Sequence, residues 1–111
     1  MNKVALDASA LHALIQNEQG AEIVKPLVHK AVMSTVNVAE ILTVLQKTDV
    51  TPQEGIHAIS DFIFDIIPFN TEQAQAVAEL QPLVKHKGLS LGDCACLALA
   101  QKMNLPVLYC R

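Results

Sequence analysis

The chain has 111 residues, of which 51% are hydrophobic and 17% are charged, so it suits one folded domain and excludes a disordered polypeptide. Its formal net charge of −3 at pH 7 argues against a broad positively charged surface for binding nucleic acids. The charge is compatible with an enzyme that brings its own metal ion to a phosphate. No apolar run approaches the roughly 18 residues of a spanning helix, and Asp7 interrupts any secretory signal, so we expect a cytoplasmic protein without a membrane partner.

Short strand patterns alternate with longer helical patterns along the chain. The first strand pattern covers residues 3–6, and a helical pattern follows over residues 8–17. A short helix is predicted over residues 21–28, kinked or shortened by Pro26, and a second strand over residues 31–34. The first part of the chain therefore predicts two strands joined through helices.

The second half continues this alternation. Apolar residues three and four positions apart predict a helix over residues 36–47, and a capping-box pattern at Thr51 starts another helix that ends near residue 62. A third strand, two further helices and a fourth strand follow in that order: residues 65–68, a helix capped by Asn70 or Thr71 and bent by Pro82, a helix opened by Ser90 over residues 91–103, and residues 106–109.

Strands separated by helices imply β-α-β units with parallel strands and right-handed crossovers. We therefore expect an α/β fold, a three-layer α/β/α sandwich around a central parallel sheet of four strands. In folds of this kind, ligands bind at the carboxyl ends of the strands. Polar residues that follow a strand are therefore the first candidates for a functional site.

Three acidic residues occupy positions that suggest more than solvation. Asp7 follows the first strand, and Asp93 lies in the first turn of the most apolar helix. Glu40 interrupts an apolar helical run, one turn after Asn37. Each acid also has a purely structural interpretation: Asp7 as a helix N-cap, Glu40 as part of a solvated stripe, and Asp93 as a capping-box acid after Ser90. Their joint placement, rather than any one of them, indicates a site.

These residues lie in three strings, LDASAL, STVNVAEIL and GLSLGDCACLALA. In order and spacing, the strings resemble the three signature segments of PIN-domain ribonucleases, and most closely those of VapC-type toxins from bacterial toxin–antitoxin pairs. The likeness extends over essentially the whole chain. It implies a metal-dependent endoribonuclease that acts on RNA with Mg²⁺ or Mn²⁺, is blocked by a small antitoxin protein and commonly forms a homodimer.

The resemblance gives individual residues a role. Asp7, Glu40 and Asp93 match the family's metal-binding and catalytic acids, while Ser9 and Asn37 match polar positions that orient ligands or water beside them. Clustered carboxylates repel one another unless a cation neutralises them, and Mg²⁺ prefers oxygen ligands, so the chemistry is consistent. A water made more acidic by the metal attacks phosphorus in line, so no Ser or His nucleophile is required.

A local basic cluster, Lys85-His86-Lys87, precedes the Asp93 helix. The resemblance makes Lys85 and Lys87 candidate RNA contacts, whereas a solvated helix end favoured by the helix dipole is the alternative. Cys94 and Cys96 lie two positions apart in a helix and face different directions, so we interpret them as small core or surface residues rather than metal ligands.

The sequence departs from the family after the LPVL string at residues 105–108. The family's fourth acid and the edge strand beyond it are absent from these residues, so we expect a single PIN-like domain over residues 1–111 that is incomplete at its C-terminus. A catalytically impaired PIN domain that only binds an antitoxin or a second copy is therefore the main alternative function. A phosphoacceptor domain using Asp7 is less consistent, because it leaves Glu40 and Asp93 without a role.

Overall fold

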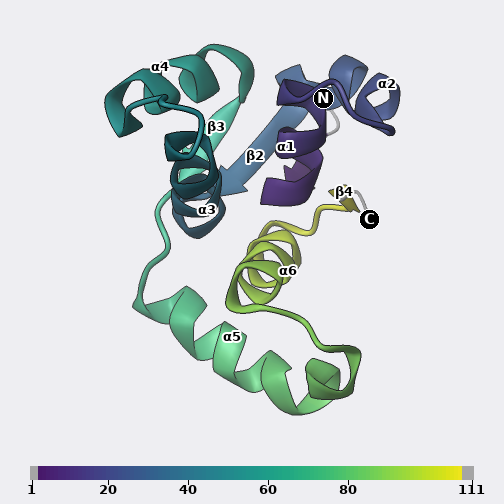
Figure 1. Ribbon diagram of the computed structural model, residues 1–111. Coiled ribbons are helices and arrows are strands. Elements are labelled where there is room, and N and C mark those ends of the chain that lie inside the picture. Colours follow the sequence, from purple (N-terminus) through teal and green to yellow (C-terminus); the bar gives the residue numbers. More distant parts are fainter. Residues whose placement is uncertain (1–2, 109–111) are drawn as a thin grey trace.

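Four short strands form one parallel sheet in the order β3-β2-β1-β4 in the computed structural model, which describes residues 3–108 (Figure 1). The strands are β1 (Val4–Leu6), β2 (Ala31–Ser34), β3 (Asp65–Ile67) and β4 (Val107–Leu108). Every neighbouring pair is parallel, as the alternation of strands and helices predicts. The predicted α/β class is confirmed. Of the predicted strand residues, Lys3 lies before β1, and Tyr109 lies outside the described residues.

Helices connect all four strands. Between β1 and β2 lie α1 (Ala8–Ile15), α2 (Ala21–Val24) and the 3-10 helix η1 (Lys25–Lys30). Between β2 and β3 lie α3 (Thr35–Gln46) and α4 (Pro52–Phe62). Between β3 and β4 lie α5 (Thr71–Val84), the 3-10 helix η2 (Lys85–Lys87) and α6 (Leu91–Met103). These bounds follow the predicted ranges to within a few residues at most ends.

The segment around Pro26 differs most from its predicted form. The α-helix ends at Val24, and the chain continues as a 3-10 helix that has Pro26 in its first turn. Proline lacks the N–H that an interior helical position would use, but the first turn of a helix tolerates it. The predicted shortening is therefore confirmed, and the remaining residues take a tighter helical form instead of loop structure.

Alternate residues of the central strands point into two different cores. Val4 and Leu6 of β1 and Met33 of β2 pack against one set of helices, which includes α1, α3 and α4. Ala5 and Val32 point to the opposite face, where they pack against α6. Both faces of the sheet are therefore covered, which is the usual condition of a parallel sheet.

Helix α6 lies between the sheet and α5, so α5 is outermost on this side of the molecule (Figure 1). Toward the sheet α6 buries Cys96 and Leu99, and toward α5 it buries Cys94 and Ala98. Because α6 is covered on two sides, its first turn is held in a fixed place beside β1. This packing positions Asp93 relative to Asp7.

The start of α4 forms the predicted capping box. The N–H of Thr51 donates to Glu54 Oε1 at 2.9 Å, and the N–H of Glu54 donates to Thr51 Oγ1 at 3.1 Å. The hydrogen bond from the Thr51 backbone N–H, and secondly hydrogen bonding by the Thr51 side chain, hold the pKa of the Glu54 carboxyl below its ordinary value of 4.5. The ionised carboxylate therefore takes part in stabilising α4.

We expect a Glu54→Gln variant to lose a pH-dependent part of the stability. Since the folded-state pKa is lowered, the carboxylate stabilises the fold above the unfolded-state pKa, and this contribution is lost as the pH falls through the folded-state pKa. The midpoint of thermal unfolding should be higher for the wild type than for the variant at pH ~6, and the two midpoints should converge toward pH ~3. A difference that stays constant across this range would contradict the role of the carboxylate.

Candidate active site

Asp7 comes directly after the last residue of β1, at the carboxyl end of the sheet. Its side chain is buried, and Oδ1 accepts hydrogen bonds from the Ala10 N–H at 3.0 Å and from the Ser9 hydroxyl at 2.7 Å. The structural interpretation of Asp7 as the N-cap of α1 is therefore present in the fold. The same bonds fix the carboxylate at the edge where ligands of such sheets bind.

Glu40 is held against the first turn of α6 by Asn37. The Asn37 side chain is 1% exposed, and its Nδ2 donates to Glu40 Oε1 and to the Gly92 carbonyl, each at 3.0 Å. A Cβ at position 92 would overlap the Glu40 carboxylate, so only glycine leaves room for this approach. Glu40 consequently belongs to a contact between α3 and α6, and the interpretation as a solvated stripe does not describe it.

Asp93 lies in the first turn of α6 and is half-buried. Its Oδ2 accepts a hydrogen bond from the Ser90 N–H at 3.0 Å, and its own N–H donates to Ser90 Oγ at 3.1 Å. This is the capping box that the sequence offered as an alternative to a functional role. Because the box uses one carboxylate oxygen, Asp93 retains Oδ1 for a ligand, and the two roles are compatible.

The thiol of Cys96 lies within electrostatic range of all three acids. Burial raises the pKa of Cys96 to about 12, with further contributions from the negative charges of Asp7, Asp93 and Glu40, in that order. Asp7 and Asp93 also line the same cavity as Cys96, whose volume is about 560 Å³. The structure thus brings the two aspartates onto one cavity and places Glu40 within electrostatic range of the same thiol.

The donor set fits a hard divalent cation bound through few protein ligands. Within residues 3–108, no group of three or more His, Cys, Asp and Glu side chains is placed to form a cage around one metal ion, so Asp7, Glu40 and Asp93 together do not form one. Mg²⁺ rarely uses such a cage, because it keeps several waters and binds through one or two carboxylates plus phosphate oxygens. The two aspartates of the cavity supply that number. Cys96 stays protonated at neutral pH, which leaves an all-oxygen set suited to Mg²⁺ or Mn²⁺.

Two further features agree with a cation at this place. In the part of the chain that the structure describes, no ion pair neutralises Glu40 or Asp93. The buried Oδ1 of Asn37 accepts no hydrogen bond from the described residues. Burying a polar atom without a hydrogen bond is unfavourable, so this acceptor suits a water molecule or ligand beside the acids.

The basic cluster is divided by the structure. Lys85, His86 and Lys87 form η2 and are all exposed, yet Lys87 borders the cavity of Asp7 and Asp93 whereas Lys85 does not. The two candidate RNA contacts therefore stand in different relations to the acids.

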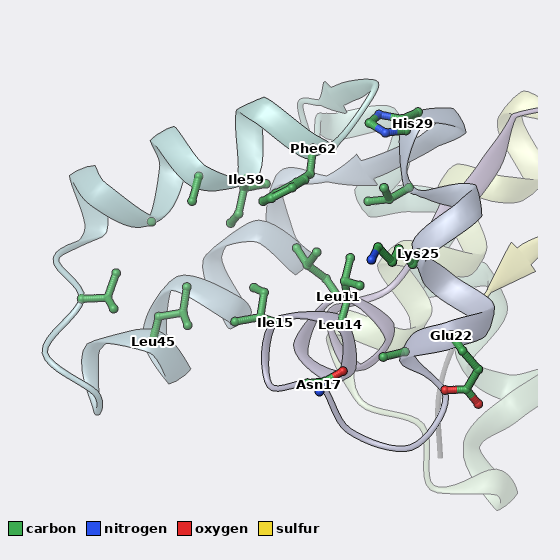
Figure 2. Close-up of a pocket in the computed structure, with 15 residues that line it drawn as sticks. Leu11, Leu14, Ile15, Asn17, Glu22, Lys25, His29, Leu45, Ile59 and Phe62 are labelled. Carbon is green, nitrogen blue, oxygen red and sulfur yellow. The ribbon is translucent and has the colours of Figure 1, made fainter.

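A larger, mainly apolar cavity of about 840 Å³ lies among α1, α2, η1, α3 and α4 (Figure 2). Figure 2 shows Ile59 and Phe62 of α4 directed toward Leu11 of α1 across this space. Polar side chains of α2 and η1 stand at one side of it: Glu22, Lys25 and His29. We name this cavity the α1–α4 groove.

Sequence reasoning missed the α1–α4 groove and the part played by Gly92. The groove was signalled by Ile59 and Phe62, which lie three positions apart on α4 and therefore on one face of the helix, and Ile59 is buried. Phe62 is in fact 47% exposed. Gly92 was signalled by its position next to Asp93, because glycine is disfavoured inside helices unless a close approach requires it.

Residues 4–110 of the sequence match the family model described as PIN domain. The chain belongs to the PIN-domain family. The resemblance carried by the three signature strings is therefore confirmed at the level of the family. A comparison with curated protein sequences gives no significant match.

Solved structures that share the fold of this PIN domain come from toxin–antitoxin complexes. A chain of a toxin–antitoxin complex from Klebsiella pneumoniae has a TM-score of 0.76 at 22% identity, covering 95% of this chain and 83% of that one. A chain of DNA-bound VapBC from Salmonella typhimurium has a TM-score of 0.67 at 16% identity, covering 95% and 83%. A chain of VapBC2 from Rickettsia felis, bound to a DNA fragment from its promoter, has a TM-score of 0.62 at 17% identity, covering 97% and 98%. At these identities the likeness establishes the fold.

No helix within residues 3–108 has the length and apolar character needed to cross a membrane.

We expect Gly92→Ala to weaken metal binding while leaving the fold intact. The new methyl group would overlap the Glu40 carboxylate, which must turn away, whereas alanine suits the helix backbone better than glycine. Mn²⁺ affinity, measured by calorimetry, should fall about tenfold, or about 1.4 kcal/mol, while the unfolding midpoint without metal is maintained or rises.

Glu40→Gln removes the charge of the same carboxylate directly and should give a similar loss of Mn²⁺ affinity. If both variants bind Mn²⁺ as the wild type does, Glu40 is not among the groups that hold the metal.

Proposed function

We propose that this PIN domain is a metal-dependent endoribonuclease of the VapC type, the toxin of a toxin–antitoxin pair. The observation that carries the proposal is the placement of Asp7 and Asp93 on one cavity, with Glu40 held beside the helix that bears Asp93. Membership of the PIN family and the fold shared with chains of toxin–antitoxin complexes support it.

In this proposal, one group of residues binds the metal ion and a second group orients the carboxylates that bind it. Asp7 and Asp93 would hold Mg²⁺ or Mn²⁺, with Glu40 as the third acid. When bound, the cation supplies a more acidic water for attack on phosphorus and offsets charge on the phosphate oxygens. Ser9 donates to Asp7 and Asn37 donates to Glu40, so each carboxylate is oriented by a second contact.

RNA cleavage should require Mg²⁺ or Mn²⁺ and stop when a chelator is added. Asp7→Asn and Asp93→Asn should each lower the rate at least about a hundredfold, because the remaining carboxylates bind the cation poorly. Both variants should stay folded, since each loses one of several mutually repelling charges. Cleavage of a mixed RNA substrate, followed on gels beside circular dichroism of each variant, tests this expectation.

Two outcomes would count against the enzyme. Cleavage that persists in chelator or in both variants would point to a contaminant or to another mechanism. A folded wild type that cleaves no RNA with either ion, yet binds an antitoxin, would instead favour the binding-only alternative.

We further propose that the α1–α4 groove receives an apolar helix of the antitoxin. The groove is lined mainly by apolar side chains, and Ile15 and Phe62 remain partly exposed along it at 39% and 47%. Exposed apolar surface of this kind commonly marks a protein interface, and a helix laid into a groove is a recurring mode of recognition. Chains with the same fold occur in toxin–antitoxin complexes, which favours the antitoxin over other occupants.

Phe62→Asp should weaken antitoxin binding at least about tenfold, because it places a charge in the apolar contact. Phe64→Asp is the matched control: Phe64 is also 47% exposed but does not line the groove. Affinity is measured by calorimetry with the antitoxin protein encoded by a small reading frame just upstream of the gene. If Phe62→Asp and Phe64→Asp bind the antitoxin with equal affinity, the antitoxin does not occupy the groove. If Phe62→Asp instead loses a concentration-dependent dimer, the groove binds a second copy of the chain.

A further inference from the structure

The cavity that contains Asp7 and Asp93 is also lined by Lys87 and by apolar side chains. These apolar residues, which form its apolar wall, are Val84, Leu89, Leu97 and Val107. Its volume of about 560 Å³ lies within the range of small-molecule pockets. The cavity is therefore of a size for one nucleotide unit, and its lining combines charged and apolar side chains.

The local backbone explains why Lys87 borders this cavity. Lys87 is the last residue of η2, and Gly88 ends that helix with a φ of 66°. Glycine adopts this left-handed conformation without strain, so the chain turns here toward Ser90 and Asp93. Lys85 lies earlier in the same short helix and stays outside the cavity.

Leu97 is the apolar residue best placed to meet a ligand. It is half-buried on α6 and lines the cavity, but it belongs to none of the three hydrophobic cores formed by the described residues. Val84, Leu89 and Val107, in contrast, also pack against those cores. The side chain of Leu97 thus presents apolar surface to the cavity, where a ligand can contact it.

We infer that this cavity is a nucleotide subsite, in which Lys87 binds a backbone phosphate of the RNA and Leu97 contacts the face of one unpaired base. The inference rests on the proposed function and adds to it the residues that bind substrate. The acids repel a phosphate, so a lysine that borders the same cavity offsets that repulsion, and lysine is a common point-charge partner of phosphate.

The chemistry of the apolar wall defines the class of substrate. A base in a duplex is stacked and paired, so its face does not reach a side chain, whereas an unpaired base can enter a pocket. The wall offers no side-chain hydrogen-bonding group to distinguish base edges. The subsite therefore selects an unpaired strand and shows little preference among the bases at this position.

The phosphate contact is tested by comparing Lys87→Ala with Lys85→Ala, which removes the same charge two residues away. Binding of a short single-stranded RNA is measured with Mg²⁺ in an Asp93→Asn background, so that cleavage does not interfere. Lys87→Ala should raise the Kd about tenfold and reduce the slope of log affinity against log salt by about 0.7, the value for one phosphate contact on a single strand. Lys85→Ala should raise the Kd less than about twofold, and Lys87→Arg should restore binding.

The base contact is tested by comparing Leu97→Ala with Leu91→Ala, since Leu91 is 61% exposed on the same helix and does not line the cavity. Leu97→Ala should lower the ratio of the affinity for the single strand to the affinity for the same strand annealed to its complement. Leu91→Ala should leave this ratio unchanged. Thermal unfolding of each variant accompanies the binding data and shows whether the fold is retained.

The outcomes separate this inference from the proposed function. If the wild type cleaves RNA but the two lysine variants bind equally, the subsite is overturned and the enzyme stands. If the wild type fails to cleave but Lys87→Ala alone shows the salt effect, the subsite stands and the catalytic proposal fails. Absence of RNA binding in every protein, or a loss of antitoxin binding alone in Lys87→Ala, would overturn the subsite.

Discussion

The buried amide of Asn37 joins the two helices on which Glu40 and Asp93 lie. One nitrogen donates both to the Glu40 carboxylate and to the backbone of Gly92, so α3 and α6 are fixed together next to Glu40 and Asp93. The contact is possible because position 92 has no side chain. A polar bond of this kind is strong inside a protein because water does not compete for it, and it gives the site a defined geometry.

The acids also contribute to the fold, and this contribution offsets part of the repulsion among their like charges. Asp7 caps α1 and Asp93 closes the capping box of α6, so each carboxylate accepts backbone hydrogen bonds. Negative charge at a helix N-terminus is favourable, and this offsets part of the mutual repulsion. The same residues thus stabilise two helices and keep their carboxylates at the carboxyl end of the sheet.

Helix α1 belongs to both functional regions of the molecule. Its N-cap is Asp7, and its apolar side, with Leu11 and Leu14, lines the α1–α4 groove. The acidic cavity is bordered by α6 and the segment before it, whereas the groove is formed by the helices between β1 and β3. The sheet order, with β1 between β2 and β4, places α1 where it can serve the two regions.

The sequence by itself determined most elements of the fold and the identity of the candidate acids. Apolar periodicity and caps such as Thr51 and Ser90 are local signals, since each depends on residues within one or two turns. The resemblance to the PIN family rests on short strings for the same reason. The tertiary structure decided what depends on distant residues: the bond from Asn37 to Gly92, the position of Cys96 within electrostatic range of three acids, and the exposure of Phe62. It also distinguished Lys87 from Lys85, because only the packing of α6 and the turn at Gly88 determine which lysine borders the acids. Spacing along a chain fixes the neighbours within an element, but contact between elements follows from how their buried surfaces pack together.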